Sequence, residues 1–168
     1  MTRLLGQHYS RLGYAVTREC ALPTLVTQPD GTVYEKVGNP LRADFIAVNK
    51  TGDIVIVETK SCLSDFEHDQ KWPRYLRCCD KFYFAAREDT AKVIAERLRC
   101  AGETTVGVIS FPAQPPIKPK VLRRAGRQNR SVSDYEILWR MAARGSGFFF
   151  GTYKSGNPFE KQTPAVIG

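Results

Sequence analysis

The strongest constraint on the fold of this chain is a pair of apolar segments separated by a short polar turn. Residues 43–48 are apolar except for Asp44, and residues 54–60 are rich in β-branched side chains. The turn between them, residues 49–53, contains Gly52, which can adopt the positive φ that many tight turns require. This pattern predicts two buried strands that pair antiparallel as a hairpin.

Three charged side chains fall at one end of the predicted hairpin. Alternate residues of a strand share a face, so Glu58 and Lys60 should project in the same direction. Asp44 lies on the neighbouring strand, within reach of Glu58. Because burying an unpaired charge is costly, such a cluster either coordinates a metal ion or forms a satisfied ion network. A network of Asp44, Glu58 and Lys60 that only stabilises the end of the sheet is therefore an open alternative to a metal site.

An aspartate followed one hairpin later by Glu-x-Lys resembles the signature of the PD-(D/E)XK nucleases. Asp44, Glu58 and Lys60 stand in the matching places. Ala43 stands where the name of the motif has proline, a position that varies within the superfamily.

A wider run of residues resembles the MmcB-related DNA-repair proteins, a branch of the same superfamily. The likeness is closest over residues 40–87, extends over residues 2–111 and stops there. The residues that carry it are Val57 to Ser61, Asp65, Phe66, Asp69, Lys71 to Pro73, Tyr75, Cys79, Asp80 and Phe82 to Ala85. The resemblance implies an α/β fold with a restriction-endonuclease-like αβββαβ core, in which helices flank a mixed central sheet. A basic C-terminal extension follows this core in the sequence.

The resemblance also implies a metal-dependent DNA nuclease that hydrolyses phosphodiester bonds in DNA repair, recombination, or phage or host DNA processing. Asp44, Glu58 and the main-chain carbonyl of Thr59 would bind Mg²⁺ or Mn²⁺, which prefer oxygen ligands. Lys60 would orient the attacking water and stabilise the transition state. Gln70 would contact the ligand residues rather than the cation and help to hold them in place. Two alternatives remain open: a nuclease-like fold that only binds nucleic acid, and a protein-interaction or structural protein.

Helical and extended patterns elsewhere predict the order αβββαβ and then αβ, which places residues 1–111 in one core. The predicted helices cover residues 2–13 and 91–101, and a further helix should begin at a capping box near Asp65. Residues 14–26 and 32–37 should supply the first strand and an edge extension, and the other predicted strands cover residues 43–48, 54–60, 81–86 and 104–111. Pro73 requires the helix from Asp65 to kink or restart. Glu19, on the first strand, is either a further acidic ligand or a solvated side chain.

Residues 112–132 differ in composition from the core, because they contain four prolines and no acidic residue. Their basic side chains are Lys118, Lys120, Arg123, Arg124, Arg127 and Arg130. Lysine and arginine can follow a phosphate backbone without fixed geometry, so we predict a flexible arm that binds nucleic acid through these side chains. The alternative is a solvated linker.

The last segment, residues 133–168, is predicted to pack on the core through a helix. Ser133 to Glu136 have the form of a capping box, and the helix should end at Gly145. The aromatic run Phe148 to Phe150 follows. We predict that it packs on the core or on a partner subunit, and stacking on unpaired bases is the alternative.

The net charge and the cysteines indicate which kinds of partner and of structural site this protein can have. A net charge of +8 favours a polyanionic partner, nucleic acid before membrane, and we expect DNA, duplex or single-stranded. Five cysteines without a CxxC pair indicate neither a zinc ribbon nor a disulfide framework. Without a membrane-spanning segment or signal peptide, we expect a cytoplasmic protein, associated with the nucleoid or, if phage-encoded, with the host cytoplasm. A homodimer is an open alternative.

Overall fold

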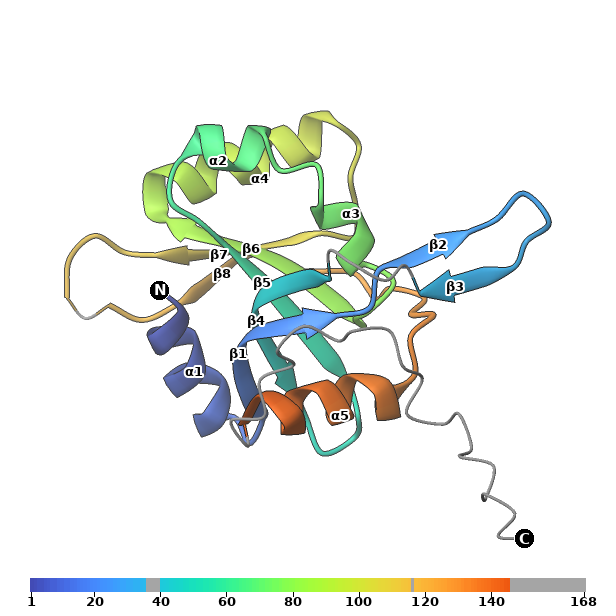
Figure 1. Cartoon of the computed structure of the whole chain (residues 1–168). Helices are drawn as coiled ribbons and strands as arrows, with labels where there is room; N and C mark the ends of the chain where they lie inside the picture. The colour runs from blue at the N-terminus through green and yellow to red at the C-terminus, as the bar shows by residue number, and fades with distance from the viewer. Residues whose placement is uncertain (36–39, 116, 146–168) are drawn as a thin grey trace, which may run out of the picture.

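A mixed six-stranded sheet forms the centre of the fold (Figure 1). The computed structural model describes residues 1–35, 40–115 and 117–145. In spatial order the strands are β1 Ala15–Leu22, β4 Leu41–Val48, β5 Ile54–Lys60, β6 Lys81–Arg87, β7 Gly107–Phe111 and β8 Lys120–Arg123. Neighbouring strands are parallel from β5 to β7 and antiparallel elsewhere. The predicted mixed central sheet is therefore confirmed.

The predicted hairpin lies in the middle of this sheet. β4 and β5 pair antiparallel from Phe45 opposite Val57 to Val48 opposite Ile54. Gly52 in the turn has a φ of 84°, in the region that favours glycine. The four paired residues of each strand are all buried, so both faces of the hairpin need covering layers.

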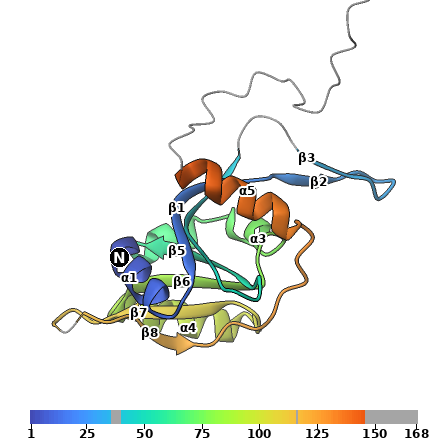
Figure 2. The same cartoon turned by 90° about the horizontal axis from the view of Figure 1, so that it is seen from below.

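Helices supply these covering layers (Figures 1 and 2). On one face, α1 (Thr2–Arg11) packs Leu5 and Tyr9 beside Phe45. On the other face lie α2 (Leu63–Glu67), α3 (Trp72–Tyr75) and α4 (Glu88–Cys100). The last helix, α5 (Asp134–Gly145), packs against β1. Helices therefore flank the sheet, as predicted, and no helix within the described ranges is long and apolar enough to cross a membrane.

The segment around Asp65 and Pro73 contains two short helices, which is the restart that Pro73 was predicted to allow as one of two outcomes. α2 begins after Cys62, and no side chain caps its first turn, so the predicted capping box is wrong at this place. Ser64 Oγ lies 3.2 Å from the Nδ1 atom of His68 instead. Pro73 then stands in the first turn of α3, where its missing N–H leaves no hydrogen bond unmade. The chain thus restarts at the proline.

A separate two-stranded hairpin projects from the body of the molecule (Figures 1 and 2). It consists of β2 (Leu25–Thr27) and β3 (Val33–Glu35). The predicted strand 14–26 is therefore divided near Pro23. An ion pair of 2.9 Å between Glu35 and Arg140 ties the hairpin to α5.

Part of the basic segment 112–132 belongs to the sheet rather than to a flexible arm. β8 pairs with β7, with Ser110 opposite Lys120. Beyond β8, the main-chain N–H of Gln128 donates to the carbonyl of Asp80 at 2.8 Å. The edge of β7 offers unpaired backbone groups, and the following strand satisfies them.

The end of this segment leads into α5. The main-chain N–H of Glu136 donates to Ser133 Oγ at 3.2 Å, which confirms the predicted cap. Ile137 and Met141 of this helix are buried against the core. Phe148 to Phe150 lie outside the described residues.

Candidate active site

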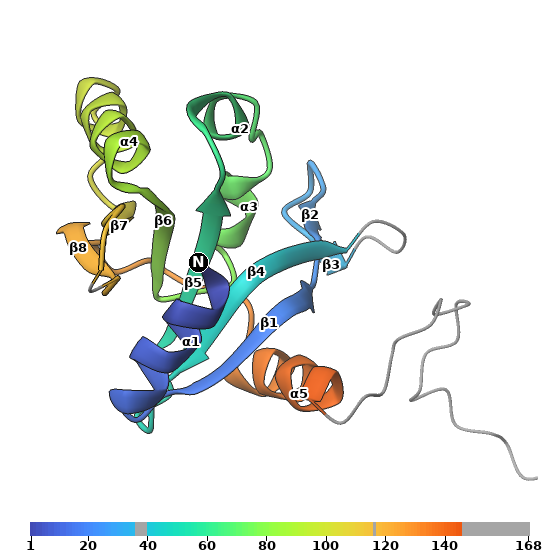
Figure 3. The same ribbon diagram turned by 90° about the vertical axis from the view of Figure 1, so that its left-hand side faces the viewer.

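The charged residues of the hairpin lie at the carboxyl end of β5, the strand that leads toward α2 in Figure 3. Lys60, the last residue of β5, is in register with Ala86 of β6. Ala86 is in register with Ser110 of β7, which pairs with Lys120 of β8. The carboxyl edge of parallel strands is where open α/β sheets generally bind ligands.

Asp44 and Glu58 lie side by side where the pairing of β4 with β5 ends. The regular pairing stops at Phe45 and Val57. Beyond it, hydrogen bonds that involve side chains connect the two strands. The main-chain N–H of Asp44 donates to Glu58 Oε1 at 3.1 Å. Asp44 Oδ2 accepts from the main-chain N–H of Thr59 at 2.8 Å and from the hydroxyl of Thr59 at 2.6 Å. The strand ends therefore hold both carboxylates in one place.

The carboxyl group of Glu58 is in an environment that disfavours its charge. Glu58 is only 5% exposed. Burial raises its pKa to about 8, and the negative charges of Asp44 and Asp69 contribute to the rise. The N–H of Asp44 and the ammonium of Lys60 offset only part of this effect. A cation between Asp44 and Glu58 would relieve the repulsion between the two carboxylates.

The oxygen atoms at this place fit a hard divalent cation that keeps part of its water shell. In the described part of the chain, no three His, Cys, Asp or Glu side chains are grouped as a metal site. Mg²⁺ is commonly held by one or two carboxylates together with waters, and Asp44 and Glu58 meet that smaller requirement. Thr59 follows Glu58 and is bonded to Asp44, so the fold brings the three predicted ligand residues together.

Lys60 shares a face with Glu58, and its ammonium group is buried in an ion pair. Its Nζ atom lies 2.5 Å from Asp69 Oδ2, and the side chains of Lys60 and Asp69 are 5% and 3% exposed. The Phe84 ring centroid is 5.6 Å from the same atom. Asp69 was not predicted as a site residue, because its approach to Lys60 depends on how the α2–α3 segment folds back.

Tyr75 and Gln70 occupy different environments on the α2–α3 segment. Tyr75 is fully buried, and its hydroxyl donates to the main-chain oxygen of Arg42 at 2.9 Å. Burial raises the pKa of Tyr75, and the negative charge of Glu58 raises it further. Tyr75 therefore stands beside the carboxylates as a protonated donor. Gln70 is exposed, and its supporting role stays a prediction.

Glu19 lies in β1 in a strained backbone conformation. Its φ is 52°, and among the described residues it is the only one other than glycine with a positive φ. The β1–β4 register pairs Arg18 with Phe45 and Cys20 with Ala43, and it omits Glu19. The Glu19 carboxylate pairs with Arg42 at 2.9 Å, and its role as a ligand stays a prediction.

Four of the predicted nucleic-acid-binding residues lie at two opposite edges of the sheet. Lys120, in register with Ser110, and Lys118 lie toward the carboxyl edge that carries the site. Arg127 and Arg130 instead pair with Asp80, at 3.2 and 3.4 Å. Asp80 directly precedes β6, so these arginines lie at the opposite, amino edge of the parallel strands.

The two remaining basic residues of this set lie near β8. Arg123 donates to the main-chain oxygen of Glu103, and Arg124 is exposed. Arg123 is thus already engaged with the core. Contact of any of the basic residues with nucleic acid stays a prediction.

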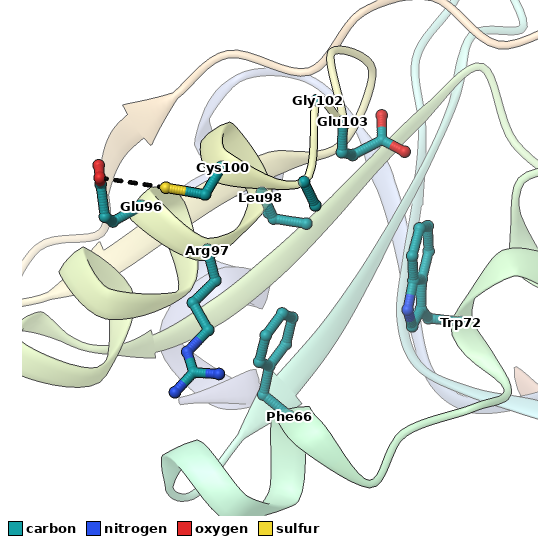
Figure 4. Close-up of a pocket in the computed structure, with 9 residues that line it drawn as sticks. Phe66, Trp72, Glu96, Arg97, Leu98, Cys100, Gly102 and Glu103 are labelled. Atoms are coloured by element: carbon teal, nitrogen blue, oxygen red, sulfur yellow. Dashed lines mark hydrogen bonds between the residues drawn. The ribbon is translucent and has the colours of Figure 1, made fainter.

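A groove of about 830 Å³ lies between the α2–α3 segment and the end of α4 (Figure 4). Phe66 and Trp72 line it, and their rings pack edge-on against Phe84, with centroids 5.0 and 5.8 Å away. Arg97 in its wall pairs with Glu67 at 2.9 Å. The predicted metal ligands are not among the lining residues. The groove is therefore separate from the candidate active site.

Comparison with known proteins supports the fold and one part of the sequence resemblance. No curated protein matches the chain. A solved structure of SPO1766, a protein of unknown function from Silicibacter pomeroyi, matches with a TM-score of 0.61 and 22% identity over 86% of this chain and 82% of that chain. This likeness concerns the fold alone. Residues 31–97, which include the carboxylates and Lys60, match the family model described as DNA repair protein MmcB-like.

Proposed function

We propose that the protein is a Mg²⁺- or Mn²⁺-dependent deoxyribonuclease that hydrolyses phosphodiester bonds in DNA repair. The observation that carries this proposal is the juxtaposition of Asp44 and buried Glu58 beside Lys60 at the carboxyl end of β5. The match of residues 31–97 to a family named for DNA repair supports it. The net charge of +8 is compatible with DNA as the partner.

Asp44, Glu58 and the main-chain carbonyl of Thr59 would hold the cation. When bound, a cation of this kind provides a nucleophilic water at neutral pH and neutralises negative charge that develops on the phosphate. Glu58 must lose its proton to act as a ligand. Cation binding is therefore expected to release a proton and to strengthen as the pH rises, because burial raises the pKa of Glu58 to about 8.

Lys60 would act on the transition state through its positive charge. Its ammonium group lies in a buried environment, where an electrostatic interaction is stronger than in water. A fixed cation beside the scissile phosphate stabilises negative charge as it develops and needs no reorganisation during the reaction. Lys118 and Lys120, on the same edge of the sheet, would bind DNA phosphates away from the cut.

A cleavage assay with defined substrates tests the proposal. Supercoiled, linear and single-stranded DNA are incubated with the purified protein in Mg²⁺, in Mn²⁺ and in EDTA. We expect cutting in the two metals, none in EDTA, and loss of cutting in Glu58→Gln. Retardation of DNA without cutting would support a binding module instead, and absence of both would support an interaction protein.

A further inference from the structure

We propose that Asp69 is the positioning residue for Lys60. This inference rests on the proposed nuclease function and deepens it, because it adds a residue to the catalytic arrangement. Asp69 does not touch the reacting atoms in this proposal. It acts by setting where the Lys60 ammonium group lies.

The first reason is the burial of the ion pair. Lys60 Nζ and Asp69 Oδ2 are 2.5 Å apart, and both side chains are almost fully buried. A lysine ammonium on a flexible four-carbon stem has many orientations in water. In this environment a single short contact selects one of them.

The second reason is that Asp69 is itself held at both carboxylate oxygens. Its Oδ1 atom accepts from the main-chain N–H groups of Lys71 and Trp72, at 2.8 and 3.2 Å. These groups open α3, so the orientation of the carboxylate follows from the backbone of the α2–α3 turn. The position of Lys60 is thereby tied to that turn.

The neighbouring acid, Asp65, is a weaker candidate for the same role. It lies 3.9 Å from Lys60 Nζ, and its side chain is 42% exposed. Its Oδ2 atom accepts from the main-chain N–H and the hydroxyl of Ser61, at 2.9 and 3.1 Å. Asp65 therefore serves as a matched control, since it is an acid near the same ammonium that is not buried with it.

The experiment is a double-mutant cycle of Lys60→Ala and Asp69→Asn, measured as the rate of cleavage at saturating DNA. Asp69→Asn keeps an oxygen for the N–H groups of α3 and removes the charge that holds Lys60. We expect it to lower the rate at least about 10-fold, with DNA affinity in EDTA unchanged within about twofold. Asp65→Asn should change the rate less than about threefold.

The double variant gives the decisive comparison. If Asp69 acts only through Lys60, the double variant should cut at the rate of Lys60→Ala. Losses that multiply in the double variant would overturn the role of Asp69 and leave the proposed function standing. Absence of cutting by the wild-type protein would overturn both.

Folding is checked in the same set of variants. Lys60→Ala leaves the Asp69 carboxylate buried without its partner, so it should lower the melting temperature, and Asp69→Asn should restore part of the loss. If Asp69→Asn does not fold, Asp69→Ser, which also offers an oxygen to the first turn of α3, takes its place in the cycle.

Discussion

At the scale of single residues, Glu58 should make the metal-free protein lose stability as the pH rises toward neutrality. The ordinary pKa of a glutamate is 4.5, and that of Glu58 is raised to about 8. Between these values the folded protein holds a proton that the unfolded chain has lost. The free energy of unfolding should therefore fall as the pH rises through this window, by up to ~1.4 kcal/mol per pH unit.

Urea unfolding in EDTA at several pH values between about 5 and 8 measures this effect, because the pKa of Glu58 lies near the upper end of that range. Glu58→Gln is neutral at every pH and should flatten the dependence. If wild type and Glu58→Gln change in parallel with pH, Glu58 is not the titrating group.

A substitution at Asp44 distinguishes a metal site from a structural ion network. Asp44→Asn keeps an oxygen that can accept from the N–H and hydroxyl of Thr59. At a pH above about 8, where Glu58 is charged, it also removes the repulsion between the two carboxylates. The metal-free variant should therefore melt at or above the temperature of wild type. With ~10 mM Mg²⁺ and an assumed Kd of ~1 mM, wild type should gain about 1.4 kcal/mol, or roughly 3–6 °C.

Thermal melts of both proteins in EDTA and in Mg²⁺ test this prediction. The variant should lose the shift that Mg²⁺ produces in wild type, together with cleavage. A variant that melts well below wild type in EDTA would instead identify Asp44 as a partner in a stabilising network.

At the scale of elements, the basic segment 112–132 has two parts. Lys118 and Lys120 lie near the candidate active site, and Arg127 forms ion pairs with Asp53 and Asp80 of the core. Replacing Lys118 and Lys120 with Ala should weaken binding to all DNA sequences alike. On duplex DNA it should reduce the slope of log affinity against log salt by roughly 0.9 for each phosphate that the variant no longer neutralises. Arg127→Ala should leave the slope unchanged, because Arg127 is engaged with Asp53 and Asp80.

Binding measured across a series of salt concentrations distinguishes the two sets. An unchanged slope in the lysine variant would show that the carboxyl edge does not contact DNA phosphates. A reduced slope in Arg127→Ala would show that the amino edge does.

The elements themselves were predictable to different degrees. The β4–β5 hairpin follows from two apolar runs and a turn glycine between them, so its position could be predicted from the sequence. The α2–α3 break was only partly predictable, because Pro73 permits a kink or a restart and tertiary packing selects the restart. β8 was missed, because Lys120 to Arg123 resemble a basic arm until the free edge of β7 is known.

At the scale of the whole molecule, we expect the two ends of the sheet to have separate roles. Asp80, at the amino edge, is 3% exposed and accepts from the main-chain N–H of Ile54 at 2.8 Å. It also pairs with Arg127 and Arg130. Asp80→Ala should therefore destabilise the fold by about 3 kcal/mol, since it leaves buried partners unsatisfied.

The cleavage rate of Asp80→Ala well below its melting temperature should stay within about twofold of wild type. The reason is distance: β5 has seven residues, so its two ends are separated by roughly 20 Å. Urea unfolding and the cleavage assay measure the two properties, and Glu88→Ala, at an exposed ion pair with Lys92, is the control with little effect on either. A large loss of rate in stable Asp80→Ala would contradict the separation.

Several features followed from the sequence alone. The paired strands, the turn between them and the meeting of Asp44, Glu58 and Lys60 at one end depend on side-chain alternation and on neighbours in the chain. Such relations are local, and a two-residue period is enough to place them.

The tertiary structure alone decided what surrounds those residues. Asp69 reaches Lys60 only because the α2–α3 segment folds back over the end of β5. Arg127 and Arg130 carry the same charge as Lys120, yet they bind Asp80 at the far edge of the sheet. Ion pairs between residues distant in the chain depend on how the elements pack, and hydrophobic burial directs that packing without regard to which charges it brings together.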